Sequence, residues 1–190
     1  MTPEKAKDLA REALSDKRFY HTECVAAMAK ELAERYGCDT EDALVAGFLH
    51  DLLKEREKAD LLQMIKASAI IEAEEIERCP ALYHAFAGGI YARDVLGVKP
   101  AIADAISYHT TGRAGMTKLE KITYLADYIS ADRCFPGVEE VREKAEKSLD
   151  LALFAAMRNQ LIHLAGSGKY IDVNSVAAYN DLSEKGDFNV

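Results

Sequence analysis

The chain has 190 residues, of which 49% are hydrophobic and 29% charged, and its formal net charge is -8. This length and composition are typical of one soluble domain that buries its core without disulfides or a structural metal. The excess of acidic residues argues against nucleic acid as the main partner, because proteins that bind nucleic acid usually present a basic face.

Three features predict a cytoplasmic protein. The four cysteines are scattered and form no CxxC pair, which is typical of a reduced chain. The N-terminal stretch MTPEKAKDLA is charged from its fourth residue, unlike a signal peptide. No apolar run approaches the roughly 20 residues that a membrane span needs. We therefore expect neither a membrane nor a nucleic acid among the partners.

Apolar residues recur at helical spacing through most of the chain, and no alternating strand pattern stands out. The first predicted helix runs from Pro3 to about Leu14. The second follows the polar break SDKR and ends at Gly37. Thr40 is predicted to cap a third helix, which carries the sequence AGFLHDLLKE near its end.

Residues 57–78 are predicted to form one or two helices, and the Cys-Pro pair at 79–80 breaks the chain. The next helix, in ALYHAFAGGIYARDVLG, ends at Gly97, and its Gly-Gly pair at 88–89 predicts close packing of another backbone. Pro100 opens a helix to about Tyr108, which the glycine-containing loop HTTGRAGM follows. Thr117 and Glu120 form a predicted capping box for KLEKITYLADYISA.

After the break FPG, helices are expected over about 138–147 and 150–165, and a short one over about 175–182. The tail from about residue 183 has weaker signals. No repeat, low-complexity segment or linker divides the chain. The sequence therefore predicts a single compact all-α domain over residues 1–190.

Four of the five histidines lie at or near predicted helix ends, among small or apolar neighbours: His21, His50, His84 and His109. Asp51 follows His50 directly, and Asp127 lies inside the apolar run ITYLADYI. A carboxylate in such a run is costly to bury unless it is paired, hydrogen-bonded or bound to a cation. Imidazoles and carboxylates together form a ligand set that suits divalent transition metals. His163 has no carboxylate nearby in the sequence, and we expect it to be structural or exposed.

The order of His21, His50-Asp51 and Asp127 resembles the HD superfamily of metal-dependent phosphohydrolases. Longer stretches are similar to successive signatures of the YqeK family: HTECVAAMAKELAERYG, AGFLHDLLKE, HAFAGGIYARDVLGV, ISYHTTGRAGMTKLEKITYLADYI and FPGVEEVR. The resemblance spans roughly residues 15–182, and it implies an HD-domain helical bundle that cleaves diadenosine tetraphosphate symmetrically. One departure is SADRCFPG, where the family pattern has a glutamate near Ser130 and a glycine near Asp132. No ligand is lost by this change, which could alter the rim of the pocket.

The resemblance also implies two divalent or trivalent metal ions, the first bound by His21, His50, Asp51 and Asp127, the second by His84, His109 and a bridging Asp51. Iron is the implied metal, whereas the ligand types alone leave manganese, cobalt and zinc open. Two cations roughly 3.5–4 Å apart lower the pKa of a shared water. A metal-bridged hydroxide is then expected to attack beside the midpoint of the tetraphosphate and release two ADP molecules.

A tetraphosphate that approaches an acidic protein needs local positive charge. The cationic side chains beside the predicted ligands are Arg18, Lys54, Arg113 and Arg133. Lys54 and Arg113 are the first choices, and with Asp51 they form the expected catalytic set. Thr110 and Thr111 are expected to donate hydrogen bonds to phosphate. The candidates to stack on adenine are Tyr83, Tyr108, Tyr128 and Phe135.

Other functions stay open on the sequence alone. One is a different HD-domain nucleotide phosphohydrolase, such as a nucleotidase or a triphosphohydrolase. Another is a protein that binds metal and nucleotide without turnover, and the simplest is a helical scaffold whose histidines only cap helices. The expected partners are a dinucleoside polyphosphate substrate and its ADP product, and an exposed helix face could support a homodimer.

Overall fold

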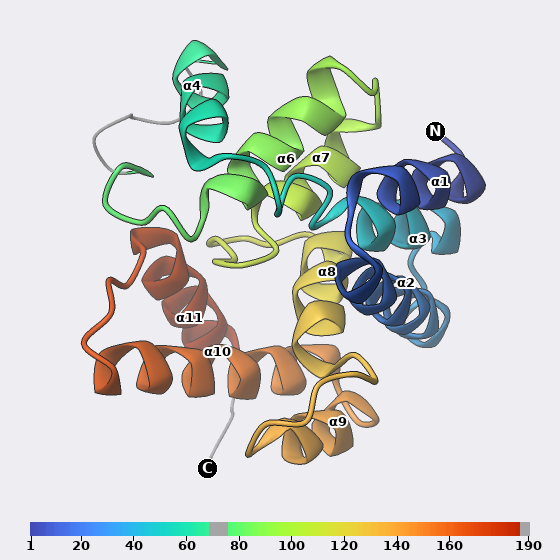
Figure 1. Cartoon of the computed structure of the whole chain (residues 1–190). Helices are drawn as coiled ribbons and strands as arrows, with labels where there is room; N and C mark the ends of the chain where they lie inside the picture. Colours follow the sequence, from blue (N-terminus) through green and yellow to red (C-terminus); the bar gives the residue numbers. More distant parts are fainter. Residues whose placement is uncertain (69–75, 187–190) are drawn as a thin grey trace.

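The computed structural model describes residues 1–68 and 76–186, and across these ranges it is built of helices without strands (Figure 1). The predicted all-α class is therefore confirmed. The helices are α1 (Pro3–Ala13), α2 (Asp16–Tyr36), α3 (Thr40–Leu49), α4 (Lys58–Ser68), α6 (Tyr83–Asp94), α7 (Pro100–Ser107), α8 (Lys118–Ile129), α9 (Val138–Ala145), α10 (Leu149–Gly166) and α11 (Val173–Lys185).

Local signals fix several helix ends where the sequence predicts them. The hydroxyl of Thr2 accepts a hydrogen bond from the backbone of Lys5 at the start of α1. Gly37 ends α2 in the left-handed conformation, with φ at 65°. The capping box of Thr117 and Glu120 is present at the start of α8.

Four predicted boundaries are wrong, and one prediction lies partly outside the described residues. Helix α6 ends at Asp94 and not at Gly97. The segment SDKR is not a break: α2 begins at Asp16, because Ser15 makes the turn and binds the carboxylate of Glu55 through its backbone and hydroxyl. Asp39, not Thr40, caps α3 by accepting from the backbone of Asp42. The last helix is longer than expected. Of the predicted helices over 57–78, residues 69–75 are not described.

Helix α8 occupies the middle of the molecule, with α2 and α3 on one side and α10 and α11 on the other (Figure 1). It packs against α2, α3, α7, α9 and α10. Its core-facing residues, such as Ile122 and Leu125, are completely buried. The last turn of α8 carries Asp127, whose side chain reaches His21 of α2 and His50 at the end of α3.

Glycines allow two close helix contacts that bring the histidine-bearing segments together. A Cβ at Gly89 of α6 would lie 2.7 Å from the carbonyl oxygen of Ala103 in α7, which confirms the predicted close approach at the Gly-Gly pair. A Cβ at Gly47 of α3 would lie 2.6 Å from Cα of Ala26 in α2. Neither position has space for a larger side chain.

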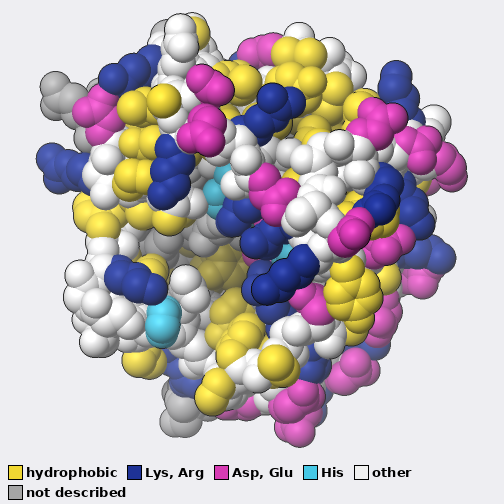
Figure 2. All heavy atoms as spheres, viewed as in Figure 1, with side chains coloured by type: hydrophobic (Ala, Val, Ile, Leu, Met, Phe, Trp, Pro, Cys, Tyr) yellow, Lys and Arg dark blue, Asp and Glu magenta, His cyan; other side chains and the backbone are white. Residues whose placement is uncertain are grey.

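The surface facing the viewer in Figure 2 has a hollow near its centre, with an apolar floor and Lys and Arg side chains along its rim. All four cysteines are free thiols. Across the described ranges, none of the helices combines the length and apolar character that a membrane crossing requires.

Candidate metal centre

The six predicted ligands come together from five separate segments of the chain. His21 lies in the second turn of α2, His50 and Asp51 at the end of α3, and Asp127 in the last turn of α8. His84 is the second residue of α6, and His109 follows α7. All four imidazoles and Asp51 are buried, whereas the side chain of Asp127 is partly exposed.

One group of ligand atoms surrounds Asp127. Its Oδ1 lies 3.0 Å from Nε2 of His21 and 3.9 Å from Nε2 of His50. These three side chains each offer an atom within 4.8 Å of the others, a spacing that allows one ion to contact all of them. Oδ2 of Asp51 lies 3.6 Å from Nε2 of His50 and adjoins this group.

A second group surrounds the other oxygen of Asp51. Its Oδ1 lies 3.2 Å from Nε2 of His84 and 3.7 Å from Nε2 of His109. The two Nε2 atoms are 3.3 Å apart. His50, Asp51 and His109 also offer ligand atoms within 4.8 Å of one another. Asp51 therefore contacts both groups, as expected for a bridging carboxylate.

Backbone carbonyls set the orientation of two imidazoles. Nδ1 of His50 donates to the carbonyl of Gly47, and Nδ1 of His109 donates to the carbonyl of Ile106, both at 2.7 Å. Each Nε2 atom is then left with a free lone pair that points into the cluster. Burial lowers the pKa of His50, and it lowers the pKa of His109 to about 3. Both rings are therefore neutral near pH 7, which is the form that binds metal.

The buried polar atoms fit a metal centre. Among the described residues, Nε2 of His50 and Oδ1 of Asp51 find no hydrogen-bond partner. Such atoms are costly to bury without compensation, and a bound cation would supply it. Burial alone would raise the pKa of Asp51, but the facing His50, His84 and Lys54 hold that pKa well below its usual range. The carboxylate is ionised and ready to bind a cation.

Three of the four predicted phosphate-binding cations contact this cluster. Nη1 of Arg18 lies 3.0 Å from Oδ2 of Asp51. Nζ of Lys54 lies 2.8 Å from Nε2 of His84 and 3.4 Å from Oδ1 of Asp51. The guanidinium of Arg133 contacts the Asp127 carboxylate, and its Nε donates a hydrogen bond of 2.8 Å to the Asp127 backbone carbonyl.

The contacts of Arg113 favour a structural role. Its guanidinium lies 2.9 Å from Oδ2 of Asp104, pairs with the buried Glu120 and stacks over the ring of Tyr108. The hydroxyl of Thr111 donates to the carbonyl of Gly112 at 2.9 Å. These groups already have partners in the protein, and phosphate binding by Arg113 and Thr111 stays a prediction.

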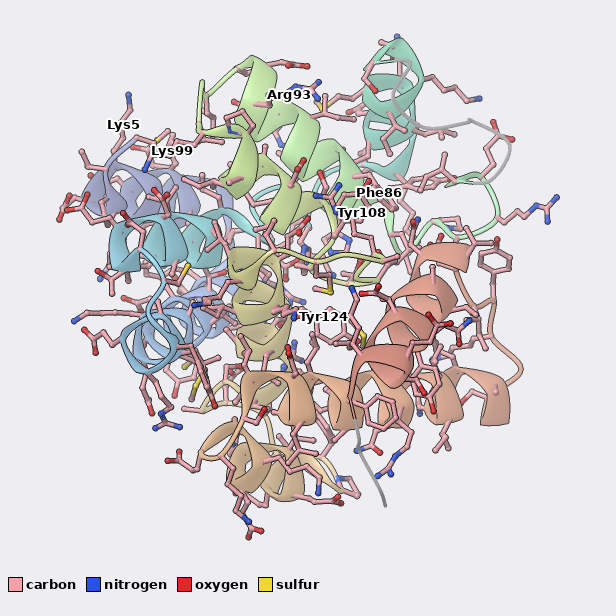
Figure 3. All side chains as sticks on the ribbon, turned by 180° about the vertical axis from the view of Figure 1, so that it is seen from behind. Lys5, Phe86, Arg93, Lys99, Tyr108 and Tyr124 are labelled. Atoms are coloured by element: carbon pink, nitrogen blue, oxygen red, sulfur yellow. The ribbon has the colours of Figure 1, made fainter. Side chains whose placement is uncertain are left out.

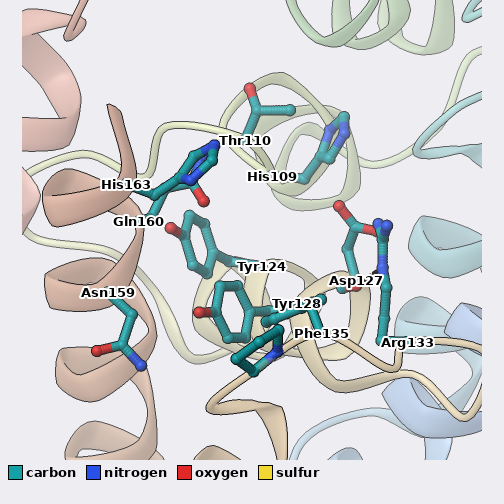
Figure 4. Close-up of a pocket in the computed structure, with 11 residues that line it drawn as sticks. His109, Thr110, Tyr124, Asp127, Tyr128, Arg133, Phe135, Asn159, Gln160 and His163 are labelled. Carbon is teal, nitrogen blue, oxygen red and sulfur yellow. Dashed lines mark hydrogen bonds and ion pairs between the residues drawn. The ribbon is translucent and has the colours of Figure 1, made fainter. Parts of the chain in front are cut away.

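A cavity of about 680 Å³ adjoins the cluster (Figure 4). His109, Asp127 and Arg133 lie on one side of it, residues of α10 lie across from them, and aromatic rings lie between. Its lining comprises His109, Thr110, Tyr124, Asp127, Tyr128, Arg133, Phe135, Pro136, Asn159, Gln160 and His163.

Two of the four candidates for adenine stacking line the cavity. Tyr128 and Phe135 line it with their rings edge to face, 5.1 Å between centroids. Tyr108 instead packs against Phe86, at 6.0 Å between centroids, as Figure 3 shows from behind. Tyr83 is buried and is not part of the lining.

Sequence reasoning missed two parts of this site. His163 is exposed, one of the two expected outcomes, but it lines the cavity together with Asn159 and Gln160. Asp132, treated only as a change at the rim, places Oδ2 2.8 Å from Nδ1 of His21. The only sequence signal for Asp132 was its departure from the family pattern.

Comparison with known proteins agrees with this geometry. The model of the HD domain family matches residues 18–132. The helical fold and the histidine–aspartate cluster are therefore those of an HD-domain protein. A crystal structure of a predicted HD superfamily hydrolase involved in NAD metabolism from Clostridium acetobutylicum superposes with a TM-score of 0.92, at 34% identity over 98% of this chain and 99% of that one.

Two curated relatives are named symmetrical bis(5'-nucleosyl)-tetraphosphatase. The protein of Bacillus subtilis (strain 168) is 39% identical over 96% of this chain and 98% of its own. That of Halalkalibacterium halodurans is 36% identical over 94% of this chain and 95% of its own. The chain belongs to the YqeK family of HD-domain hydrolases, as the sequence motifs predict.

Proposed function

We propose that this chain hydrolyses diadenosine tetraphosphate symmetrically and releases two ADP molecules. The observation that carries the proposal is the convergence of four imidazoles and two carboxylates beside a cavity lined with aromatic rings. Curated relatives that match almost the whole chain carry the name of this activity. The same relatives favour this function over a mononucleotide phosphohydrolase.

We propose that the ligands hold two metal ions, the first bound by His21, His50, Asp51 and Asp127, the second by His84, His109 and the shared Asp51. Iron is the proposed metal, and manganese, cobalt and zinc are the alternatives that this ligand set accepts. When bound, a pair of such cations lowers the pKa of water and neutralises charge on phosphate oxygens.

The cations at the cluster would bind the phosphate chain. Arg18, Lys54 and Arg133 lie next to the acidic ligands, so positive charge is concentrated there in a chain that is acidic as a whole. Thr110 adds a hydroxyl in the cavity wall that has no partner among the described residues and is free to donate. These groups would hold the tetraphosphate so that its central phosphates lie at the ligands.

We propose that the cavity binds one nucleoside. Its volume falls within the range of small-molecule pockets. Tyr128 and Phe135 present ring surfaces on which a base can stack. The side-chain amides of Asn159 and Gln160 carry both donors and acceptors, which the edge of a nucleobase requires. Phe135→Ala should raise the KM for diadenosine tetraphosphate by about tenfold while the metal content stays the same.

The decisive experiment is chromatography of the products from diadenosine tetraphosphate, with the metal content of the same preparation measured alongside. ADP as the sole product, at two equivalents per substrate, supports the proposal. AMP plus ATP would indicate asymmetric cleavage. Release of phosphate from mononucleotides, with dinucleotides inert, would favour another HD-domain phosphohydrolase. Tight binding of metal and nucleotide with no turnover would indicate a binding protein.

A further inference from the structure

His21 lies between two carboxylates, one on each ring nitrogen. Nε2 faces Oδ1 of Asp127 at 3.0 Å, on the side of the other ligands. Nδ1 faces Oδ2 of Asp132 at 2.8 Å, on the opposite side of the ring. A carboxylate is only an acceptor, so in the metal-free chain each ring nitrogen can donate to the carboxylate that it faces. With an ion bound at Nε2, Nδ1 would keep its proton and donate it to Asp132.

We infer that Asp132 is a positioning residue, which orients the metal ligand His21 and raises its basicity. This inference rests on the proposed metal centre. A carboxylate behind a ligating imidazole fixes the tautomer and the ring orientation, and it makes the other nitrogen a stronger donor to the ion. Asp132 is not among the residues that line the cavity, and its carboxylate hydrogen-bonds to the proposed ligand His21, through which it would act.

The loop that carries Asp132 is held firmly in place. Oδ1 of Asp132 accepts a hydrogen bond of 2.7 Å from the hydroxyl of Ser130, which is completely buried. Each oxygen of the carboxylate therefore has its own partner. The position is set by tertiary structure and not by a flexible surface contact, since the side chain of Asp132 is only 20% exposed.

A side chain of α9 fixes the same loop from outside. The guanidinium of Arg142 donates to the backbone carbonyls of Ile129, Ser130 and Arg133, at 3.0, 2.6 and 2.9 Å. The carbonyls of Ile129 and Ser130 lie at the end of α8, where helix geometry leaves them without partners in the helix, and that of Arg133 lies in the loop beyond. A chain of contacts thus runs from Arg142 through the loop to Asp132, and from there to His21.

The other ligand histidines have weaker support. His50 and His109 donate through Nδ1 to backbone carbonyls within their own segments, which are neutral acceptors. Nδ1 of His84 lies 3.5 Å from the ammonium of Lys54. In the described part of the chain, His21 is the ligand histidine whose outer nitrogen faces a carboxylate. Hydrogen bonds to an ionised acceptor are roughly twice as strong as neutral ones.

Ser130 supplies the hydroxyl that orients the carboxylate, and Asp132 supplies the carboxylate itself. Ser130 and Asp132 therefore act together to supply a partner for His21.

The test is a titration of the metal-free full-length chain with Co²⁺ against a competing chelator, followed by the visible absorption of bound cobalt. Asp132→Ala should weaken one of the two binding steps by about 10- to 100-fold and leave the other unchanged. Asp132→Asn keeps an acceptor for Nδ1 and should lose less affinity than Asp132→Ala. Ser130→Ala keeps the Asp132 carboxylate but removes the hydroxyl that orients it. It should weaken the same cobalt-binding step to a smaller degree.

The matched control is Asp150→Ala, which removes an exposed carboxylate that pairs with Lys121 at 2.6 Å. It should bind both cobalt ions like the unchanged chain. Circular dichroism and urea unfolding of each variant would establish that the fold is retained. Excess Co²⁺ should restore the kcat of Asp132→Ala with the KM for diadenosine tetraphosphate unchanged, which a general loss of structure would not allow.

The inference is overturned if Asp132→Ala binds both cobalt ions as tightly as the unchanged chain. It is also overturned if excess Co²⁺ leaves the kcat of a folded Asp132→Ala low. The proposed function fails separately, and independently of Asp132, if the unchanged chain binds no cobalt or yields no ADP from diadenosine tetraphosphate.

Discussion

Oδ1 of Asp51 lies 3.2 Å from Nε2 of His84, and these residues come from the ends of two different helices. The second oxygen of Asp51 faces away from His84, toward Arg18 at 3.0 Å and His50 at 3.6 Å. One carboxylate therefore serves two sets of histidines. This division distinguishes the two proposed ion positions and suggests how to remove one of them.

Loss of His109 should empty one position and leave the other. His109→Ala removes a ligand that contacts the His84 side of Asp51, whereas His21, His50 and Asp127 keep their mutual contacts. We expect one ion per chain in place of two, and a fall in kcat of about 100-fold or more. Metal analysis and steady-state kinetics would measure both. Two ions per chain with near-full turnover would show the assignment of His109 to be wrong; exposed Lys30→Ala is the control.

Lys54 should act on substrate more than on metal. Its ammonium lies at the cluster but cannot itself bind a cation. Lys54→Met should lower kcat/KM by about 10- to 100-fold, the loss typical of a hydrogen bond to a charged group, with two ions per chain retained. Lys121→Met, which loses a partly buried pair with Asp150 away from the cluster, should keep full activity. An unchanged kcat/KM in Lys54→Met would remove this residue from the phosphate site.

Arg113 should matter for stability more than for chemistry. Its removal leaves Glu120 buried without its ion-pair partner. Breaking a fully buried pair costs about 3–5 kcal/mol, and because the Arg113 side chain is 31% exposed we expect about 2–3 kcal/mol for Arg113→Met. Urea unfolding would measure this loss, and adding Glu120→Gln should recover part of it. A large fall in kcat/KM with unchanged stability would instead place Arg113 in the catalytic set.

The contact between α6 and α7 should tolerate no side chain at Gly89. The added Cβ of Gly89→Ala would meet the Ala103 carbonyl and the Ser107 hydroxyl, so we expect a loss of about 1–3 kcal/mol in the free energy of unfolding. Gly166 of α10 has open space around it, and Gly166→Ala should be neutral or stabilise by about 0.5 kcal/mol. Equal unfolding midpoints for the two variants would show that the close approach is unimportant.

The metal-free chain should lose stability in mild acid because of His109. Burial lowers the pKa of His109 to about 3, so below pH 6.5 the unfolded chain takes up a proton that the folded chain does not. Its free energy of unfolding should fall by about 1.4 kcal/mol for each pH unit from 6.5 toward 4. Burial also lowers the pKa of His50, which adds to the slope.

The titrations of His21 and of the buried aspartates do not reduce this slope between about pH 6.5 and 4. Burial would lower the pKa of His21, but Asp127 and Asp132 raise it overall, so the stabilisation from His21 is fully present below pH 6.5 and is lost only as the pH rises. The lowered pKa values of Asp51 and Asp132 act below about pH 4. Urea unfolding of His109→Gln should show a shallower pH dependence than that of the unchanged chain. Identical slopes would contradict a buried neutral His109.

The features that could be predicted from the sequence are those that depend on neighbouring residues or on a motif. The capping box of Thr117 and Glu120 spans one helical turn, and it is therefore readable locally. The glycine pair signals a close contact because no other residue type needs so little space. The ligand histidines stand out because imidazoles among apolar residues are unusual, and a family motif orders them.

Contacts between residues that are far apart in the sequence could not be predicted from local patterns. Asp132 and His21 are 111 positions apart, and nothing local shows that their side chains meet. The orientation of the Arg113 side chain depends on its ion pair with Glu120, a residue that the sequence predicts only as part of a capping box. Asn159 and His163 lie one turn apart on α10, and only the packing of α10 against α8 places them beside the ligands.

The ligands come from α2, α3, α6, α8 and the segment after α7, so a bound ion would join parts of the chain that are far apart in sequence. Such an ion acts as a reversible cross-link, and it stabilises the native state by mass action because the unfolded chain cannot assemble the same ligands. Chelation should then lower the melting temperature of the whole molecule and not only loosen the active site. The supply of metal would then affect how long the protein stays folded as well as how fast it hydrolyses its substrate.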